Sequence, residues 1–256
     1  MMKKFFGFFI ASVFVFLLFS CAYAPPSYLP LGSETVLPSV SEKETQAPDT
    51  QNENKKNVHI MIDAGHGGRD PGAIASYDGV TYREKDINLS ISLLLREELL
   101  LRGYTVFFTR EDDRLLLDGR DNIAEIKARR ELALELETDL YISLHCNSFD
   151  GEARAYGPIV FYREKANYRA RKFADILKNA ITEGMKEHPD TRECRMKRDD
   201  DYAVLKTDSM PTLLFEMGFL TDRSDAMQLI DTEWQSALVR AIADGIDDMY
   251  DNKYID

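Results

Sequence analysis

The sequence has little cysteine, no glycine motif for nucleotides and no excess of positive charge, and each absence excludes a class of protein. Three Cys in 256 residues cannot build a disulfide-stabilised scaffold. Neither a P-loop nor a GxGxxG motif occurs, which argues against a nucleotide-dependent enzyme. Lys and Arg number 32 against 44 Asp and Glu, so the formal net charge is −12. Because nucleic acids are bound by clustered Lys and Arg, no nucleic-acid partner is expected.

The N-terminus has the features of an export signal. Two lysines precede an apolar run over 5–19, which is short for a membrane span but suits the core of a signal peptide. The run ends in Leu-Phe-Ser-Cys at Cys21, which resembles the bacterial lipobox, whose Cys is lipidated. An A-x-A pattern that begins at Ala22 is the competing site for ordinary cleavage, and an uncleaved anchor is the third alternative. We predict a signal peptide over 1–21 and an exported, periplasmic protein that meets the membrane only through a lipid on Cys21, or is otherwise soluble.

Residues 22–57 are predicted to form a disordered linker. Five of the nine Pro lie at or before position 48, among Ser, Glu, Thr, Asn and Gln. Such a composition buries too little apolar surface to fold. The 199 residues that follow position 57 carry the whole net charge, as 27 basic and 39 acidic residues. Since hydrophobic residues make up 44% of the chain, we expect one folded catalytic domain over 58–251.

From residue 58 onward, short apolar runs alternate with segments of helical periodicity. The runs predict strands over 58–63, 105–109, 140–144, 159–162, 202–205 and 212–215. The periodic segments predict helices over 86–101, 122–137, 167–181, 225–230 and 233–250. This alternation predicts an α/β fold, a single domain with a mostly parallel twisted sheet of about six strands and helices on both faces. Binding sites in such sheets lie beyond the carboxyl ends of the strands, so the residues that follow the strands are the candidates.

Two histidines occupy such positions, and a glutamate at the start of the first helix is a third candidate. His66 lies in a glycine-rich loop after the first strand, His145 ends the third strand, and Glu84 precedes the first helix. Taken singly, a His is more often structural, and an acidic residue at a helix start is favoured by the helix dipole. Together, two imidazoles and one carboxylate match a catalytic zinc site with one open position. The three are too far apart in sequence for a local motif such as HExxH, so the fold would have to assemble the site.

A second carboxylate ends the last predicted strand. Glu216 follows an apolar run, and burying a carboxylate is costly unless it is paired, protonated or close to a cation. A metal at the neighbouring strand ends would supply that cation. The alternative is a structural glutamate in a salt bridge.

Four sequence blocks together resemble the zinc-dependent N-acetylmuramoyl-L-alanine amidases of the type-3 family. The blocks are IDAGHGG, EKD, SLHCN and LFEMGFL, and the resemblance spans about residues 58 to 250. It implies that His66, Glu84 and His145 hold one Zn²⁺ per chain and that Glu216 is the catalytic carboxylate. It also implies peptidoglycan as the substrate, cut at the amide between N-acetylmuramic acid and L-alanine during wall remodelling and cell separation. No residue is assigned to substrate binding.

Some members of this family carry an extra helical segment that covers the zinc until a partner removes it, so a division-machinery activator is a possible partner. Here the stretch 183–201 is charged and short, and we expect an open site. Cys146 departs from the small residue usual in the family. It adjoins His145 on a strand, so it should point to the opposite face and into the core. Cys194 is flanked by arginines and is predicted to be a surface thiol.

Two other functions fit the same residues. A different zinc hydrolase, such as a peptidoglycan peptidase or carboxypeptidase, would use the same metal set and cut another bond. A non-catalytic wall-binding lipoprotein would be expected to lose at least one of the four site residues, and all four are present. The sequence has no Ser-x-x-Lys motif, so a penicillin-binding serine enzyme lacks its nucleophile. The amidase is therefore the preferred prediction.

Overall fold

The computed structural model describes residues 55–117, 121–151, 155–164 and 168–255. The predicted signal peptide over 1–21, with Cys21, and nearly all of the linker over 22–57 lie outside the described residues. Among the helices in the described part of the chain, none combines the length and apolarity needed to cross a membrane.

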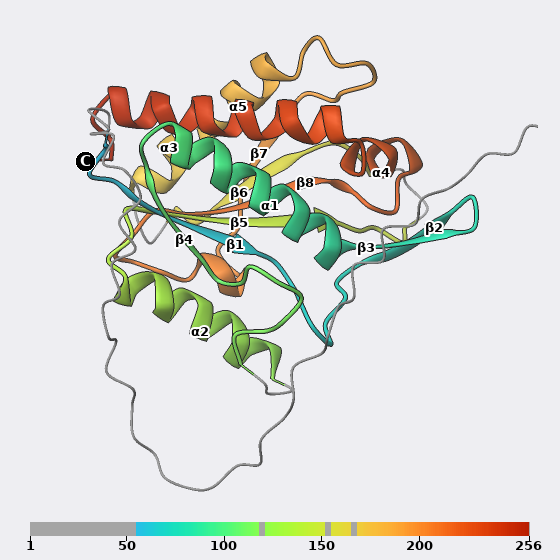
Figure 1. Cartoon of the computed structure of the whole chain (residues 1–256), viewed down its shortest axis with the longest axis horizontal. Helices are drawn as coiled ribbons and strands as arrows, with labels where there is room; N and C mark the ends of the chain where they lie inside the picture. The colour runs from blue at the N-terminus through green and yellow to red at the C-terminus, as the bar shows by residue number, and fades with distance from the viewer. Residues whose placement is uncertain (1–54, 118–120, 152–154, 165–167, 256) are drawn as a thin grey trace, which may run out of the picture. The chain divides into compact units, whose positions relative to one another are not determined.

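A six-stranded sheet forms the centre of the fold, with the strand order β4-β1-β5-β8-β6-β7 (Figure 1). The strands are β1 (His59–Ala64), β4 (Thr105–Phe108), β5 (Leu140–Asn147), β6 (Ile159–Tyr162), β7 (Arg195–Arg198) and β8 (Thr212–Phe219). Neighbours from β4 to β8 run parallel, β6 is antiparallel to β8, and β7 is parallel to β6. The predicted α/β domain with a mostly parallel six-stranded sheet is confirmed.

Helices cover both faces of this sheet (Figure 1). They are α1 (Glu84–Leu101), α2 (Asn122–Glu135), α3 (Tyr168–Gly184), α4 (Arg223–Leu229), α5 (Thr232–Asp251) and the short 3₁₀ helix η1 (Ala203–Leu205). Strand side chains alternate between two cores. Ile60 and Ile62 pack in the large core with α1, α3 and α5, whereas Met61 packs in the smaller core on the side of α2 and η1. The thinner α2 side is the one that carries the candidate site.

A two-stranded hairpin links the His66 loop to α1. Its strands, β2 (Ile74–Tyr77) and β3 (Val80–Arg83), pair antiparallel through a turn at Asp78 and Gly79. Both turn residues have positive φ, at 53° and 80°, as a type I′ Asp-Gly turn requires. The hairpin ends at Arg83, so it delivers Glu84 directly to the start of α1.

The predicted strand over 202–205 was wrong. Residues Ala203–Leu205 form η1 instead, because β8 already pairs with β5 and β6 on its two sides. The Arg130 guanidinium holds the turn by donating to the carbonyls of Ala203 at 2.7 Å and Lys206 at 2.8 Å. The sixth strand is β7, whose Arg-Met-Lys-Arg sequence has no apolar run.

The prediction for Cys194 was also wrong, whereas the one for Cys146 is confirmed. Cys194 is 1% exposed and its backbone N–H donates to Thr182 of α3. Burial raises the pKa of its thiol to about 12, despite the nearby charges of Lys178 and Arg195. Cys146 lies in the large core, as the alternation along β5 predicts. Burial raises the pKa of both thiols and so disfavours their reactive thiolate form in the native fold.

Candidate metal centre and active site

His66, Glu84 and His145 meet at the carboxyl edge of the sheet, and their ligand atoms all lie within 4.8 Å of one another. Glu84 Oε1 lies 3.1 Å from Nε2 of His66 and 2.8 Å from Nδ1 of His145. Tetrahedral zinc with bonds of about 2.0–2.1 Å places its ligand atoms about 3.3 Å apart. The three donors thus have the chemistry and nearly the spacing of a zinc site, and the fold brings together the three predicted ligands.

The His66 loop is shaped by glycine and by backbone strain. His66 itself has a positive φ of 62°, an unusual conformation for a side-chain residue. A Cβ atom on Gly65 would lie 2.2 Å from Nε2 of His145, and one on Gly72 would lie 2.5 Å from Oε2 of Glu84. Only glycine therefore lets the loop pass this close to two of the donor residues.

The carboxylates around His66 stabilise the protonated, positively charged form of its imidazole. Asp70 Oδ2 lies 2.9 Å from Nδ1 of His66, which leaves Nε2 directed at Glu84. Burial disfavours the imidazolium, but Glu84 and Asp70 outweigh it and raise the pKa of His66 to about 9. A bound metal cation would be stabilised by the same carboxylates. Asp70 also has the place of an outer partner that fixes the tautomer of a ligating histidine.

Two buried arginines hold the backbone that leads to His66. Arg129 of α2 donates to the carbonyl of His66 at 2.8 Å and to that of Ala64 at 2.9 Å. Arg110 donates to the carbonyls of Ala64 at 2.8 Å and Gly65 at 3.0 Å. Each carbonyl accepts a charge-assisted hydrogen bond, so the loop is fixed from two sides.

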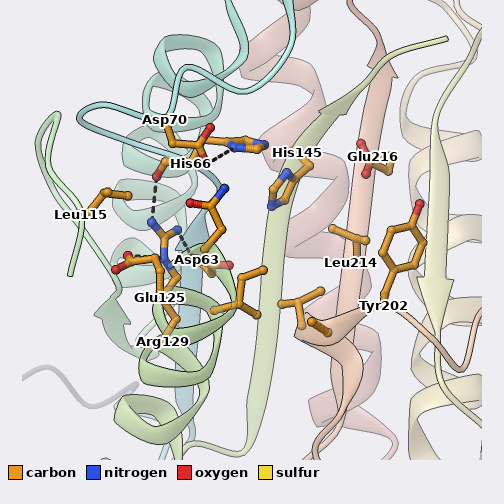
Figure 2. A pocket seen from close by; sticks show the side chains of 14 residues that line it. Asp63, His66, Asp70, Leu115, Glu125, Arg129, His145, Tyr202, Leu214 and Glu216 are labelled. Atoms are coloured by element: carbon orange, nitrogen blue, oxygen red, sulfur yellow. Dashed lines mark hydrogen bonds and ion pairs between the residues drawn. The ribbon is translucent and has the colours of Figure 1, made fainter. Parts of the chain in front are cut away.

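Asp63 neutralises Arg129 beneath the site (Figure 2). The two side chains are almost fully buried and 2.9 Å apart. Asp63 also accepts hydrogen bonds from Thr109 at 2.7 Å and Ser143 at 2.6 Å. Burial opposes ionisation, but the Arg129 guanidinium and these hydrogen bonds outweigh it and hold the pKa of Asp63 well below its usual range. On its other side Arg129 pairs with Glu125, one helical turn away, at 2.9 Å.

Glu216 stands beside the metal donors. β5 and β8 pair so that His145 and Glu216 are direct neighbours across the sheet (Figure 2). The glutamate is 8% exposed, and its Oε2 has no hydrogen-bond partner among the described residues. Burial raises the pKa of Glu216 to about 7, with a further contribution from the Glu84 charge that the two histidines oppose. A carboxylate in this state can both accept and donate a proton near neutral pH.

A cavity of about 300 Å³ opens over these groups on the α2 side of the sheet. It is lined by Asp63, His66, Asp70, Leu115, Asn122, Glu125, Ile126, Arg129, His145, Tyr202, Ala203, Val204, Leu214 and Glu216. His66, Asp70 and Leu115 lie towards one side of the cavity, and Leu214, Glu216 and Tyr202 lie towards the other (Figure 2). None of residues 183–201, all of which the structure describes, lines the cavity. The expectation that this segment leaves the site open is therefore confirmed.

The family is decided by comparison with known proteins. The family model described as N-acetylmuramoyl-L-alanine amidase (Amidase_3) matches residues 60–248. The chain belongs to this amidase family. The matched range runs from β1 to α5 and contains every residue of the site described above.

Relatives of the amidase domain agree in sequence and fold. YqiI of Bacillus subtilis (strain 168) is 33% identical over 193 residues, which cover 75% of this chain and 84% of YqiI. Among the solved structures, an N-acetylmuramoyl-L-alanine amidase from Clostridium difficile 630 has a TM-score of 0.67 at 28% identity, covering 78% of this chain and 99% of that one. The CwlD amidase from Clostridioides difficile, in complex with the GerS lipoprotein, has a TM-score of 0.64 at 30% identity, covering 76% and 99%. Several curated relatives are longer, and the match covers 38% to 56% of them.

Sequence reasoning missed several residues of this amidase site. Asp70 was visible only as part of the glycine-rich loop, and its contact with His66 depends on how that loop turns. The i,i+4 spacing of Glu125 and Arg129 was readable, but such pairs usually lie on the surface of a helix. Tyr202 was placed in a strand, so its position at the cavity could not be foreseen.

Proposed function

We propose that the protein is a zinc-dependent hydrolase of the amide bond between N-acetylmuramic acid and L-alanine in peptidoglycan. Family membership supports the reaction class. The observation that carries the proposal for this chain is the pairing of Glu216 with His145 across the sheet, beside the group of three metal donors. In this proposal His66, Glu84 and His145 hold one Zn²⁺, and Glu216 is the catalytic residue.

The donor set suits zinc and this reaction. Two neutral imidazoles and one carboxylate leave a bound Zn²⁺ with a net charge near +1 and an open coordination position. Zinc held there would act as a Lewis acid towards the scissile carbonyl and would lower the pKa of water at the site. Asp70 and Arg129 contribute by fixing the ring and the backbone of His66.

Glu216 moves the proton. It accepts a proton from the attacking water as the new carbon–oxygen bond forms. It then donates that proton to the nitrogen of L-alanine as the carbon–nitrogen bond breaks. An amine leaves as the neutral molecule far more readily than as an anion, so this second transfer is essential for an amide. The burial of Glu216 and its unpartnered Oε2 beside the three candidate ligands both support this role.

We also propose that the enzyme is exported to the periplasm and acts there in wall remodelling and cell separation. A lipid on Cys21 would hold it at the membrane, and ordinary signal cleavage would release it. Labelling with a fatty-acid analogue distinguishes lipidation from ordinary signal cleavage. A lipoprotein should take up the label at Cys21 and lose it in a Cys21→Ala variant, whereas a protein released by ordinary cleavage should not be labelled. The solved complex of CwlD with the GerS lipoprotein supports a search for an activating partner, including one from the division machinery.

Mass spectrometry of the reaction products tests the proposed reaction. The purified protein is incubated with peptidoglycan, with and without a metal chelator. We expect free stem peptides that begin with L-alanine, lost with chelator and restored by zinc. Shortened peptides that stay attached to sugar would instead show a zinc peptidase. A zinc-loaded, folded protein that releases nothing, even with candidate activators, would contradict the proposal and favour a wall-binding role.

A further inference from the structure

Two basic residues of β7 stand on the same face of the sheet as Glu216. The strand registers place Glu216, Ile159 and Arg195 in one row across β8, β6 and β7. Lys197, two residues further along β7, lies beside Phe161 on that face. Because neighbouring strands are about 4.8 Å apart, the backbone of Arg195 lies about 10 Å from that of Glu216. Its long side chain can span part of this distance.

Aromatic contacts join the cavity to the same part of the sheet. Tyr202 lines the cavity together with Glu216 (Figure 2). The Tyr202 ring packs edge-on against Phe161, with 5.2 Å between the ring centroids. Lys197 Nζ lies 5.7 Å from the centroid of that Phe161 ring. The Lys197 ammonium group is therefore separated from the cavity wall by one aromatic ring.

Arg195 and Lys197 carry positive charges without a carboxylate partner in the part of the chain that the structure describes. Both side chains are exposed, and neither forms an ion pair with any residue that the structure describes. Arg195 donates instead to two backbone carbonyls of the loop before β6. Arg198 alternates to the other face of β7 and, in contrast, pairs with two carboxylates. The net charge of the chain is −12, yet β7 carries two positive charges without a carboxylate partner among the described residues, and both lie on the face of the sheet that holds Glu216.

We infer that Arg195 and Lys197 bind a free carboxylate of the stem peptide and so form a specificity subsite. This inference rests on the proposed function, because the stem peptide is the leaving part of that reaction. Stem peptides carry carboxylates two or three residues from the scissile amide. An extended chain advances about 3.3 Å per residue, so such a group lies about 7–10 Å from the reacting nitrogen. That reach matches the separation between Glu216 and β7.

The test compares two soluble muramoyl tripeptides whose stem carboxylates are either free or amidated. Values of kcat/KM are measured for the full-length protein, for R195Q/K197Q and for the control K55Q/R240Q. The control removes the same charge, since Lys55 and Arg240 are exposed and Arg240 lies on α5, which covers the opposite face. An ion pair between an exposed Arg or Lys and a carboxylate contributes modestly to binding free energy. We therefore expect the kcat/KM of the wild type to be about threefold to tenfold higher for the tripeptide with free carboxylates. The difference should lie mainly in KM and shrink in high salt.

In R195Q/K197Q the ratio of kcat/KM between the free and the amidated tripeptide should fall to about one, whereas K55Q/R240Q should keep the ratio of the wild type. A preference that survives in R195Q/K197Q overturns the subsite and leaves the proposed function intact. If the wild type cleaves neither tripeptide, the same comparison is made on peptidoglycan with free or amidated stem peptides, with candidate activators present. Release from neither form overturns the proposed function itself, and the subsite with it. Weaker binding of R195Q/K197Q to intact cell walls, with unchanged tripeptide kinetics, also overturns the inference, because the cations would then serve an anionic wall polymer. Circular dichroism checks that both variants fold.

Discussion

Replacing Arg129 with Met should lower both the stability of the fold and the affinity of the candidate metal centre for zinc. The variant leaves Asp63 buried without its counter-charge and removes the donors to the carbonyls of Ala64 and His66. Breaking a buried ion pair by removing one partner typically costs about 3–5 kcal/mol. A domain of this kind is stable by only about 5–15 kcal/mol, so the loss is a large share of the total. We also expect zinc affinity to fall about 10–100-fold, because the position of His66 is no longer fixed.

Urea unfolding at several pH values measures the first effect, and zinc titration measures the second. The depressed pKa of Asp63 stabilises the native state above its ordinary pKa and ceases to do so as pH falls. The stability gap between wild type and R129M should therefore be largest near neutrality and should narrow below about pH 4. Adding Asp63→Asn to R129M should recover part of the loss. A gap below about 1 kcal/mol at pH 7, or strict additivity of the two substitutions, would refute this reasoning.

Four further predictions concern single features of the site and the core. Glu216→Gln should lower kcat about 10²–10⁴-fold and leave zinc content and fold unchanged, which atomic absorption and circular dichroism check. Asp70→Ala should weaken zinc binding about 10–100-fold in a chelator competition, and unchanged affinity would contradict its contact with His66. Gly65→Ala should reduce both zinc binding and thermal stability, because its Cβ atom would lie 2.2 Å from His145; normal loading would contradict the tight packing. Cys194 should react with a thiol reagent only after unfolding, and rapid reaction of the native protein would show that it is accessible.

The buried parallel strands were the most predictable part of the fold. β1, β5 and β8 are covered on both faces, so their sequences are continuous apolar runs that end where the chain reaches the site. The edge strand β7 has no such run, because its Arg-Met-Lys-Arg sequence exposes charge to solvent. The Asp78-Gly79 dipeptide is typical of a hairpin turn, but the strands β2 and β3 on its two sides are too short and too polar to be predicted from apolar runs.

His66 and His145 were predictable as candidate metal ligands because they lie at the carboxyl ends of β1 and β5, neighbouring parallel strands whose ends share an edge. Glu84 was predictable only from its block at the start of the first helix, since the separate β2–β3 hairpin delivers it to the site. The groups that hold these ligands were not predictable, because their partners are distant in sequence. Asp63 and Arg129 are 66 residues apart, and the pair forms only when α2 packs over the end of β1. Burial of Cys194 likewise depends on how α3 lies against β7, which periodicity does not reveal.

The direction of β1 has a mechanical consequence. The chain enters the domain at the amino edge of the sheet, where the Lys56 ammonium group binds Asp247 and lies over the rings of Tyr104 and Tyr250. β1 then runs to the opposite edge and ends at the His66 loop. If the N-terminus is held while the site grips a fixed polymer, tension runs along β1. Its parallel neighbours β4 and β5 would resist that pull in shear, with several backbone hydrogen bonds sharing the force at once.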